Sequence, residues 1–137
     1  MKLINYAAAF TALELLSQIE LPYKMAYNIA KLKRQISPKA EYFQTEELRI
    51  ARKYGKQLPD GRLDIKGSRL CMKGDTDADI AANMESYTKE REALCNIEDN
   101  DIENAVIEKP VISIPPEAKI KPFIIEALDG FCVFGQV

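Results

Sequence analysis

The stretch from Tyr23 to Tyr54, YKMAYNIAKLKRQISPKAEYFQTEELRIARKY, decides the fold because its pattern predicts one long helix. Apolar residues recur in it every seven positions, at Ile29, Ile36, Phe43 and Ile50. A seven-residue repeat aligns side chains along one stripe of a helix, as in coiled coils. We therefore expect this helix to pack against a partner helix along the stripe.

The second series of positions in this stripe changes character along the chain. It is apolar at Met25 and Leu32 and charged at Lys39, Glu46 and Lys53. The apolar stripe is therefore strong in its first half and thin in its second. Apolar side chains of this stripe that are not covered within the chain can be covered by a partner protein.

Ser37-Pro38 interrupts the predicted helix. Proline removes one backbone hydrogen bond and clashes with the preceding turn, at a cost of about 3 kcal/mol. The helix can kink and continue, or it can stop at Ile36 and restart with Ser37 as its N-cap. The repeat stays in phase across the break, which favours a kink or a tight restart.

The segment from Leu3 to Ile19 predicts a first helix, with Glu14 as its only charged residue. A helix so apolar around a wide arc should be buried on two sides. Leu21-Pro22 ends it, because the residue before a proline disfavours the helical conformation.

Turn residues dominate the chain after the long helix. Leu58 to Arg62 carries a Pro-Asp-Gly turn signal, and Arg62 to Lys66 alternates polar and apolar residues. Gly67-Ser68 gives a second turn before Arg69 to Met72. This order predicts a small β-hairpin.

A third helix should begin in Asp75 to Asp79, because capping residues and acids suit a helix N-terminus. Its apolar face is broken by Arg91, and the acidic stretch from Asn96 to Glu103 ends it. This face consists of Ile80, Met84, Tyr87 and Leu94.

The C-terminal part contains short apolar segments separated by prolines. We predict extended segments at Val106-Ile107 and Val111 to Ile114, a helix start at Pro115-Pro116-Glu117, helical turns at Phe123 to Leu128, and a docked apolar tail at Phe131 to Phe134. The predicted fold is a single domain over residues 1–137, mainly α with a small β element. Its centre is an antiparallel long helical hairpin, coiled-coil-like, with a short β-hairpin or turn at its tip and a short strand/helix tail.

Charge is unevenly distributed along the chain. Residues 1–56 carry ten Lys and Arg against five Asp and Glu, whereas residues 75–110 carry three against eleven. We interpret this as a basic second helix packed on an acidic third one. The alternative is a basic surface for an acidic partner or a phosphate backbone, formed by Lys31, Lys33, Arg34, Arg49, Arg52 and Lys53.

Composition argues against catalysis and generic nucleic-acid binding. The chain has no His, which removes the commonest general base and metal ligand, and its net charge is −2. Asp75, Asp77 and Asp79 have calcium-loop spacing, but Ile80 stands where a glycine is required, so we interpret them as capping residues. We assign no catalytic residue, metal ligand or cofactor, and leave the binding residues unassigned.

Three widely spaced cysteines, Cys71, Cys95 and Cys132, are typical of free thiols in a reducing compartment. No apolar run approaches the roughly 18 residues of a membrane span, and no signal-peptide pattern appears. We expect a protein of the cytoplasm, and a virion component would have the same properties.

Leu21 to Leu32, LPYKMAYNIAKL, resembles the helix start of a family of small proteins of unknown function from tailed phages and prophages of Gram-positive bacteria. Arg52 to Gly55 and the segment from Ile114-Pro115 to Phe123 reinforce the resemblance. Family members usually carry an uninterrupted second helix, from which Ser37-Pro38 departs. The resemblance implies a phage or prophage origin, with a role in virion assembly, host takeover or counter-defence, and it brings no catalytic residues.

We therefore expect a phage-encoded protein that binds another protein, as a virion structural or assembly factor without catalytic activity. The alternative is a small inhibitor that binds a host defence protein, such as a nuclease. A nucleic-acid-binding accessory factor is a third hypothesis. The expected partner is a phage structural protein or a host target, not a membrane, and self-association stays open.

Overall fold

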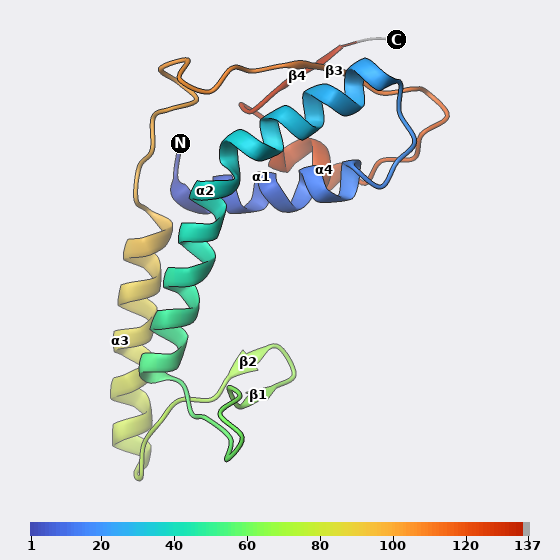
Figure 1. Cartoon of the computed structure of the whole chain (residues 1–137). Coiled ribbons are helices and arrows are strands. Elements are labelled where there is room, and N and C mark those ends of the chain that lie inside the picture. Colours follow the sequence, from blue (N-terminus) through green and yellow to red (C-terminus); the bar gives the residue numbers. More distant parts are fainter. Residues whose placement is uncertain (136–137) are drawn as a thin grey trace. The chain divides into compact units, whose positions relative to one another are not determined.

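The computed structural model describes residues 1–135 and confirms a mainly helical chain with small strand elements (Figure 1). Its helices are α1 (Leu3–Leu16), α2 (Tyr23–Tyr54), α3 (Asp77–Cys95) and α4 (Pro122–Ala127), and its strands are β1 (Ile65–Lys66), β2 (Arg69–Leu70), β3 (Val111–Ser113) and β4 (Val133–Gly135). Among these residues, no helix is both long enough and apolar enough to cross a membrane.

The chain forms two compact units. Unit 1 combines residues 1–42 with the chain from Ile97 onward, and unit 2 is Phe43–Asn96. Helix α2 contributes its first part to unit 1 and its last part to unit 2.

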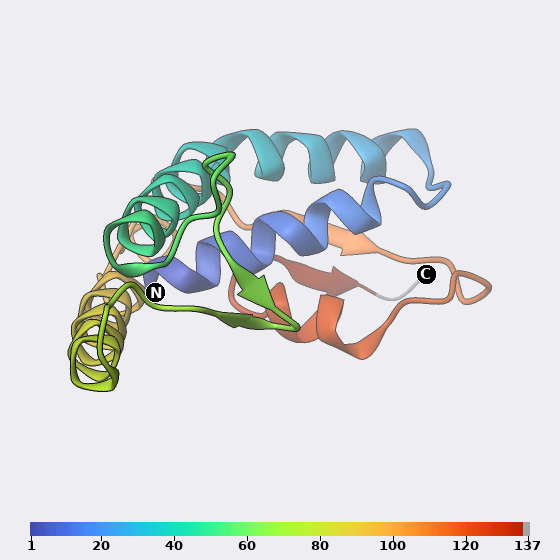
Figure 2. The ribbon, with the colours of Figure 1, turned by 90° about the horizontal axis from the view of Figure 1, so that it is seen from below.

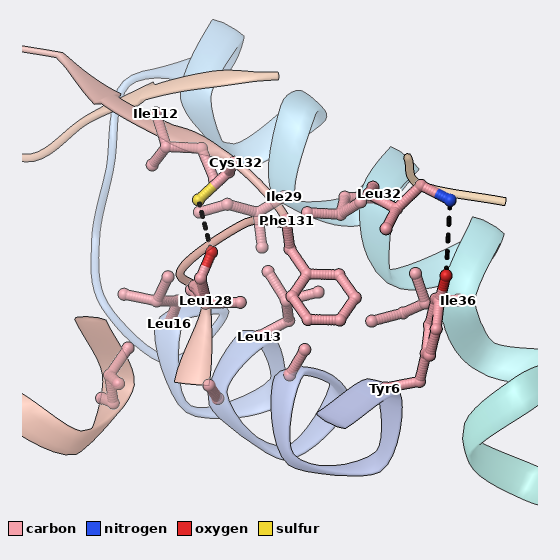
Figure 3. Close-up of a cluster of buried hydrophobic side chains, with 14 of the residues drawn as sticks. Tyr6, Leu13, Leu16, Ile29, Leu32, Ile36, Ile112, Leu128, Phe131 and Cys132 are labelled. Carbon is pink, nitrogen blue, oxygen red and sulfur yellow. Dashed lines mark hydrogen bonds between the residues drawn. The ribbon is translucent and has the colours of Figure 1, made fainter. Parts of the chain in front are cut away.

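The core of unit 1 is built around α1, which lies between the first part of α2 and helix α4 (Figure 2). Tyr6, Leu13 and Leu16 of α1 are fully buried, and this helix packs against α4 and shares its core with residues of the first part of α2. The rings of Tyr6 and Phe131 meet edge to face, with centroids 5.1 Å apart (Figure 3).

The apolar seven-residue repeat of α2 is buried at each of its four positions, Ile29, Ile36, Phe43 and Ile50. The helix is continuous through Pro38. A restart capped by Ser37 is therefore wrong, and the Ser37 hydroxyl instead donates to the Glu41 carboxylate at 3.3 Å. Continuation keeps Ile36 and Ala40, on either side of the proline, completely buried, and this burial opposes the cost of the proline.

The C-terminal tail docks on unit 1 as predicted, because Phe131 and Cys132 are buried. Strand β4 pairs in parallel with β3, in the register Val111↔Val133, Ile112↔Phe134 and Ser113↔Gly135. The residue Ile112 is fully buried in the core, so this small sheet closes one side of unit 1.

Two predictions for the C-terminal part are wrong. Val106-Ile107 is not extended, because both amides donate to the Asp101 carbonyl oxygen and close a turn in which Ala105 has a φ of 58°. Pro115-Pro116-Glu117 forms a turn instead of starting a helix. A residue before a proline disfavours the helical conformation, and the few residues before Pro122 leave no room for a helix.

Within unit 2, α3 lies beside the last part of α2 and runs in the opposite direction (Figures 1 and 2). The side chain of Thr76 accepts a hydrogen bond from the Asp79 amide at 3.2 Å, and Asp77 lies in the first turn, which confirms the predicted capping stretch. The β-hairpin is also confirmed, with β1 antiparallel to β2 and Gly67 at positive φ in the turn.

A polar cluster joins α1, α2 and the acidic loop of unit 1, which is the loop that contains Asp99 and Asp101. The ammonium group of Lys39 lies 2.6 Å from a carboxylate oxygen of Asp99 and 2.6 Å from one of Asp101. The Tyr6 hydroxyl donates to Asp99 at 3.0 Å and accepts from the Ile102 amide at 3.3 Å. Lys39 therefore fills its stripe position as part of a half-buried ion cluster.

The oppositely charged groups of this cluster stabilise each other's ionised forms. Burial alone disfavours the ionised form of Asp99, but hydrogen bonds from Lys39, the Asp101 amide and Tyr6 lower its pKa below the usual range. Burial likewise disfavours the charged form of Lys39, and its two aspartate partners nevertheless raise its pKa. Both groups are therefore ionised at neutral pH.

We predict that Leu13→Ala, in the centre of this core, destabilises the protein by about 2–5 kcal/mol because it leaves a cavity. The free energy of unfolding in urea measures the effect. Tyr23→Ala serves as the control, since Tyr23 is 86% exposed, and should change stability by less than about 0.5 kcal/mol. Equal effects of the two substitutions would contradict the assigned core.

We predict that Lys39→Met destabilises unit 1 by about 1–3 kcal/mol at neutral pH, since it leaves two half-buried carboxylates without their cation. A carboxyl group with a lowered pKa contributes stability above its unfolded pKa of about 3.9, and this is lost as pH falls through the folded value. Stability curves of both proteins between neutral and acid pH should therefore converge at low pH. With Lys24→Met, at an exposed position, the curve should follow that of the unmodified protein.

Candidate protein-binding surface

Unit 2 buries few apolar side chains. In the described part of the chain, the buried ones of unit 2 are Phe43, Ile50, Ala51, Met72 and Leu94, whereas unit 1 has a large continuous cluster. Burial of apolar surface is the dominant favourable term in folding, so unit 2 has a weaker core of its own.

Other apolar side chains of unit 2 face solvent. Leu48 on α2 is 47% exposed, Ile65 on β1 56%, and Met84 on α3 39%. Single exposed apolar residues are ordinary, but a group around one hollow is typical of an interaction surface.

Two hollows adjoin each other in unit 2. The larger has a volume of about 530 Å³ and lies between β2 and α3, and the smaller, of about 320 Å³, lies between α2, the β1 segment and α3. Leu70, Tyr87 and Arg91 line both hollows. The other lining residues are Ser68, Arg69, Met72, Met84, Thr88 and Glu92 in the larger hollow, and Gln44, Glu47, Leu48, Ala51, Leu63 and Ile65 in the smaller.

Backbone hydrogen bonds hold the chain segments that lie next to the residues lining these hollows. The Lys56 amide donates to the Cys71 carbonyl at 2.7 Å, and the Lys73 amide donates to the Tyr54 carbonyl at 2.8 Å. These bonds fix the strand segment against the end of α2. A Cβ on Gly55 would overlap the Ala51 carbonyl oxygen and lie 3.1 Å from both methyl groups of Leu70, so glycine allows Leu70 to pack here.

Ion pairs fix the walls formed by α2 and α3. Arg91 pairs with Glu47 at 3.0 Å. Glu90 accepts from the Lys53 ammonium group and the Tyr54 hydroxyl, each at 2.8 Å, and these hydrogen bonds lower the pKa of Glu90. The hollows are therefore bounded by side chains that are already oriented.

The six basic residues predicted as an alternative binding surface do not remain free as a group. Lys31 pairs with Glu108, Lys33 with Glu14, Arg49 with Glu46 and Lys53 with Glu90. Three of the six lie in unit 1 and three in unit 2. Most of this positive charge is therefore used in pairs within each unit.

The three cysteines and the three aspartates Asp75, Asp77 and Asp79 do not line the two hollows. Cys71 and Cys95 are half-buried free thiols, and Cys132 is a buried one whose pKa is raised by burial to about 11. Within residues 1–135, no group of three or more Cys, Asp or Glu side chains is arranged to hold a metal ion.

Sequence reasoning left the binding residues unassigned and missed these hollows. The signals were present in the alternating pattern of Leu63 and Ile65 and in the break that Arg91 makes in the apolar face of α3. The sequence pattern does not indicate that the β-hairpin packs near the two helices, because this packing depends on tertiary contacts. No family model matches the chain, and comparisons with curated proteins and with solved structures also give no match.

We predict that Gly55→Ala loosens unit 2 by about 1–3 kcal/mol, because the added Cβ meets backbone that cannot move aside. Hydrogen exchange at the Lys56 and Lys73 amides should accelerate, whereas exchange at the Leu128 amide in unit 1 should not. Thr45→Ala, at an exposed position of α2, is the control and should leave all three protected. Unchanged exchange at Lys56 and Lys73 in the Gly55 variant would contradict the role of Gly55.

Proposed function

We propose that this protein acts by binding another protein, and that unit 2 makes the contact. The observation that supports the proposal is the pair of hollows around Leu70 and Tyr87, whose apolar walls stay exposed in a unit with a small core. An apolar centre surrounded by polar and charged side chains is typical of protein–protein interfaces.

We further propose that the last part of α2 and α3 form a coiled-coil-like helical hairpin that presents this surface. The buried stripe at Phe43 and Ile50 and the ion pairs of Glu47 and Glu90 support this arrangement. Charged pairs beside an apolar stripe set the direction and register of such helices.

In this proposal binding is not coupled to catalysis. Its support is the sequence, which lacks His and any recognised nucleotide or nucleophile motif. The side chains that line the two hollows include arginine and glutamate, but the arginine common to both is engaged by Glu47.

The resemblance of Leu21 to Leu32 to the phage family supports a more specific role. We propose a phage or prophage protein that resides in the host cytoplasm and serves as a virion structural or assembly factor. The alternative is an inhibitor that uses the same surface to block a host defence protein.

The test is deletion of the gene from an inducible phage, with complementation by the unmodified protein or by Tyr87→Asp, which places a charge between the two hollows. An assembly factor predicts loss of particles on deletion and no rescue by Tyr87→Asp. Ala8→Asp, at an exposed position of α1, is the control and should rescue.

Normal particle yield combined with poor infection of defended hosts would favour the inhibitor. If Tyr87→Asp rescues every deletion defect, the proposed binding surface is wrong. Circular dichroism of each purified variant shows whether it is folded.

A further inference from the structure

The β-hairpin of unit 2 contains an unfavourable pair of charges. Lys66 and Arg69 are direct cross-strand partners. Like charges directly opposite each other destabilise an antiparallel pair. Both side chains are exposed, and within the described residues neither forms an ion pair. The fold itself therefore gives no reason for two cations at this rung.

The surrounding chain does not neutralise this pair. Residues 55–73, which contain the hairpin, carry five Lys and Arg against two Asp and Glu. Asp60, one of the two acids, is engaged by Arg62 at 2.6 Å. The hairpin end of unit 2 thus carries a net positive charge, although the whole chain has a net charge of −2.

The adjacent rung of the hairpin is apolar. Ile65 pairs with Leu70, and both line the hollows described above. Because side chains alternate between the two faces of a strand, the Ile65–Leu70 rung and the Lys66–Arg69 rung present opposite faces. The apolar rung borders the hollows, Arg69 also lines the larger hollow, and Lys66 is the cross-strand partner of Arg69.

Building on the proposed binding function, we propose that this tip docks an acidic amphipathic segment of another protein. Apolar side chains of the segment enter the hollows beside Leu70 and Tyr87. Its carboxylates contact Lys66 and Arg69 and relieve their mutual repulsion. Complementary charge at Lys66 and Arg69 then selects the partner and accelerates its association.

The same cations do not favour a nucleic acid. Glu92 lines the larger hollow and would repel a phosphodiester backbone that followed it. A protein segment can place an uncharged residue opposite this glutamate and carboxylates only near Lys66 and Arg69. The apolar rung also contributes to binding apolar side chains and contributes nothing to phosphate contacts.

The experiment selects binders of the intact chain from a library of random displayed peptides. The expected enriched peptides combine Asp or Glu with spaced Leu, Ile or Phe. Their affinity should fall about tenfold or more in Lys66→Glu/Arg69→Glu and in Tyr87→Asp. Lys119→Glu/Lys121→Glu makes the same charge change at two exposed lysines of unit 1 and should leave affinity unchanged. Thermal unfolding of each variant shows that it is folded.

Salt and competition separate the remaining outcomes. Binding should weaken as NaCl rises from about 0.05 to 0.5 M, because contacts with Lys66 and Arg69 are screened. Peptides without acidic enrichment, or peptides insensitive to the Lys66/Arg69 change, would overturn this inference and leave the binding function standing. Displacement of the peptides by single-stranded DNA or RNA would also overturn it.

Self-association is separated by sedimentation. A dimer that becomes monomeric in Tyr87→Asp would assign the hollows to a second copy and overturn the inference. If no peptide is enriched and the gene-deletion test also shows no role for Tyr87, the proposed function fails together with the inference.

Discussion

The apolar stripe of α2 is the constraint on which the rest of the structure depends. Its first residues, such as Ile29 and Ile36, belong to the core of unit 1, and its later residues Phe43 and Ile50 are the buried centre of unit 2. One continuous helix therefore supplies apolar surface to two separate units. Burial of this surface on both sides of Pro38, at Ile36 and Ala40, opposes the cost of a proline inside the helix.

The charged positions of the stripe are used differently in the two units. Lys39 is drawn into a half-buried cluster with Asp99 and Asp101, which ties the acidic loop to α2. In unit 2, Lys53 pairs with Glu90 at the surface. From the sequence alone, both lysines only indicate that the apolar stripe becomes thinner. We expect from the sequence that the third helix supplies the acidic partners of the basic second helix. In the structure the acidic loop supplies some of them, because its carboxylates reach the first part of α2.

Local signals predicted what local interactions determine. Periodicity identified the helices, and the Gly67-Ser68 turn and alternating residues identified the β-hairpin. Contacts between distant segments were not predictable in the same way. The parallel pairing of β3 with β4 joins residues about twenty positions apart, and the turn at Ala105 uses a positive φ that alanine seldom adopts. The hollows depend on such distant contacts, so their residues were recognisable only as unassigned apolar positions.

The two units differ in how completely their charged groups find partners and their apolar side chains are buried. In unit 1, the acidic loop has its cation, and the Tyr6 hydroxyl has both a donor and an acceptor. Unit 2 keeps exposed apolar walls and opposes Lys66 to Arg69. Natural sequences are mostly consistent with their folds, and the places where they break a local rule tend to be functional. An unfavourable rung beside a hollow is such a place, and in our proposal its cost in the free chain becomes a gain in affinity when an acidic partner covers it.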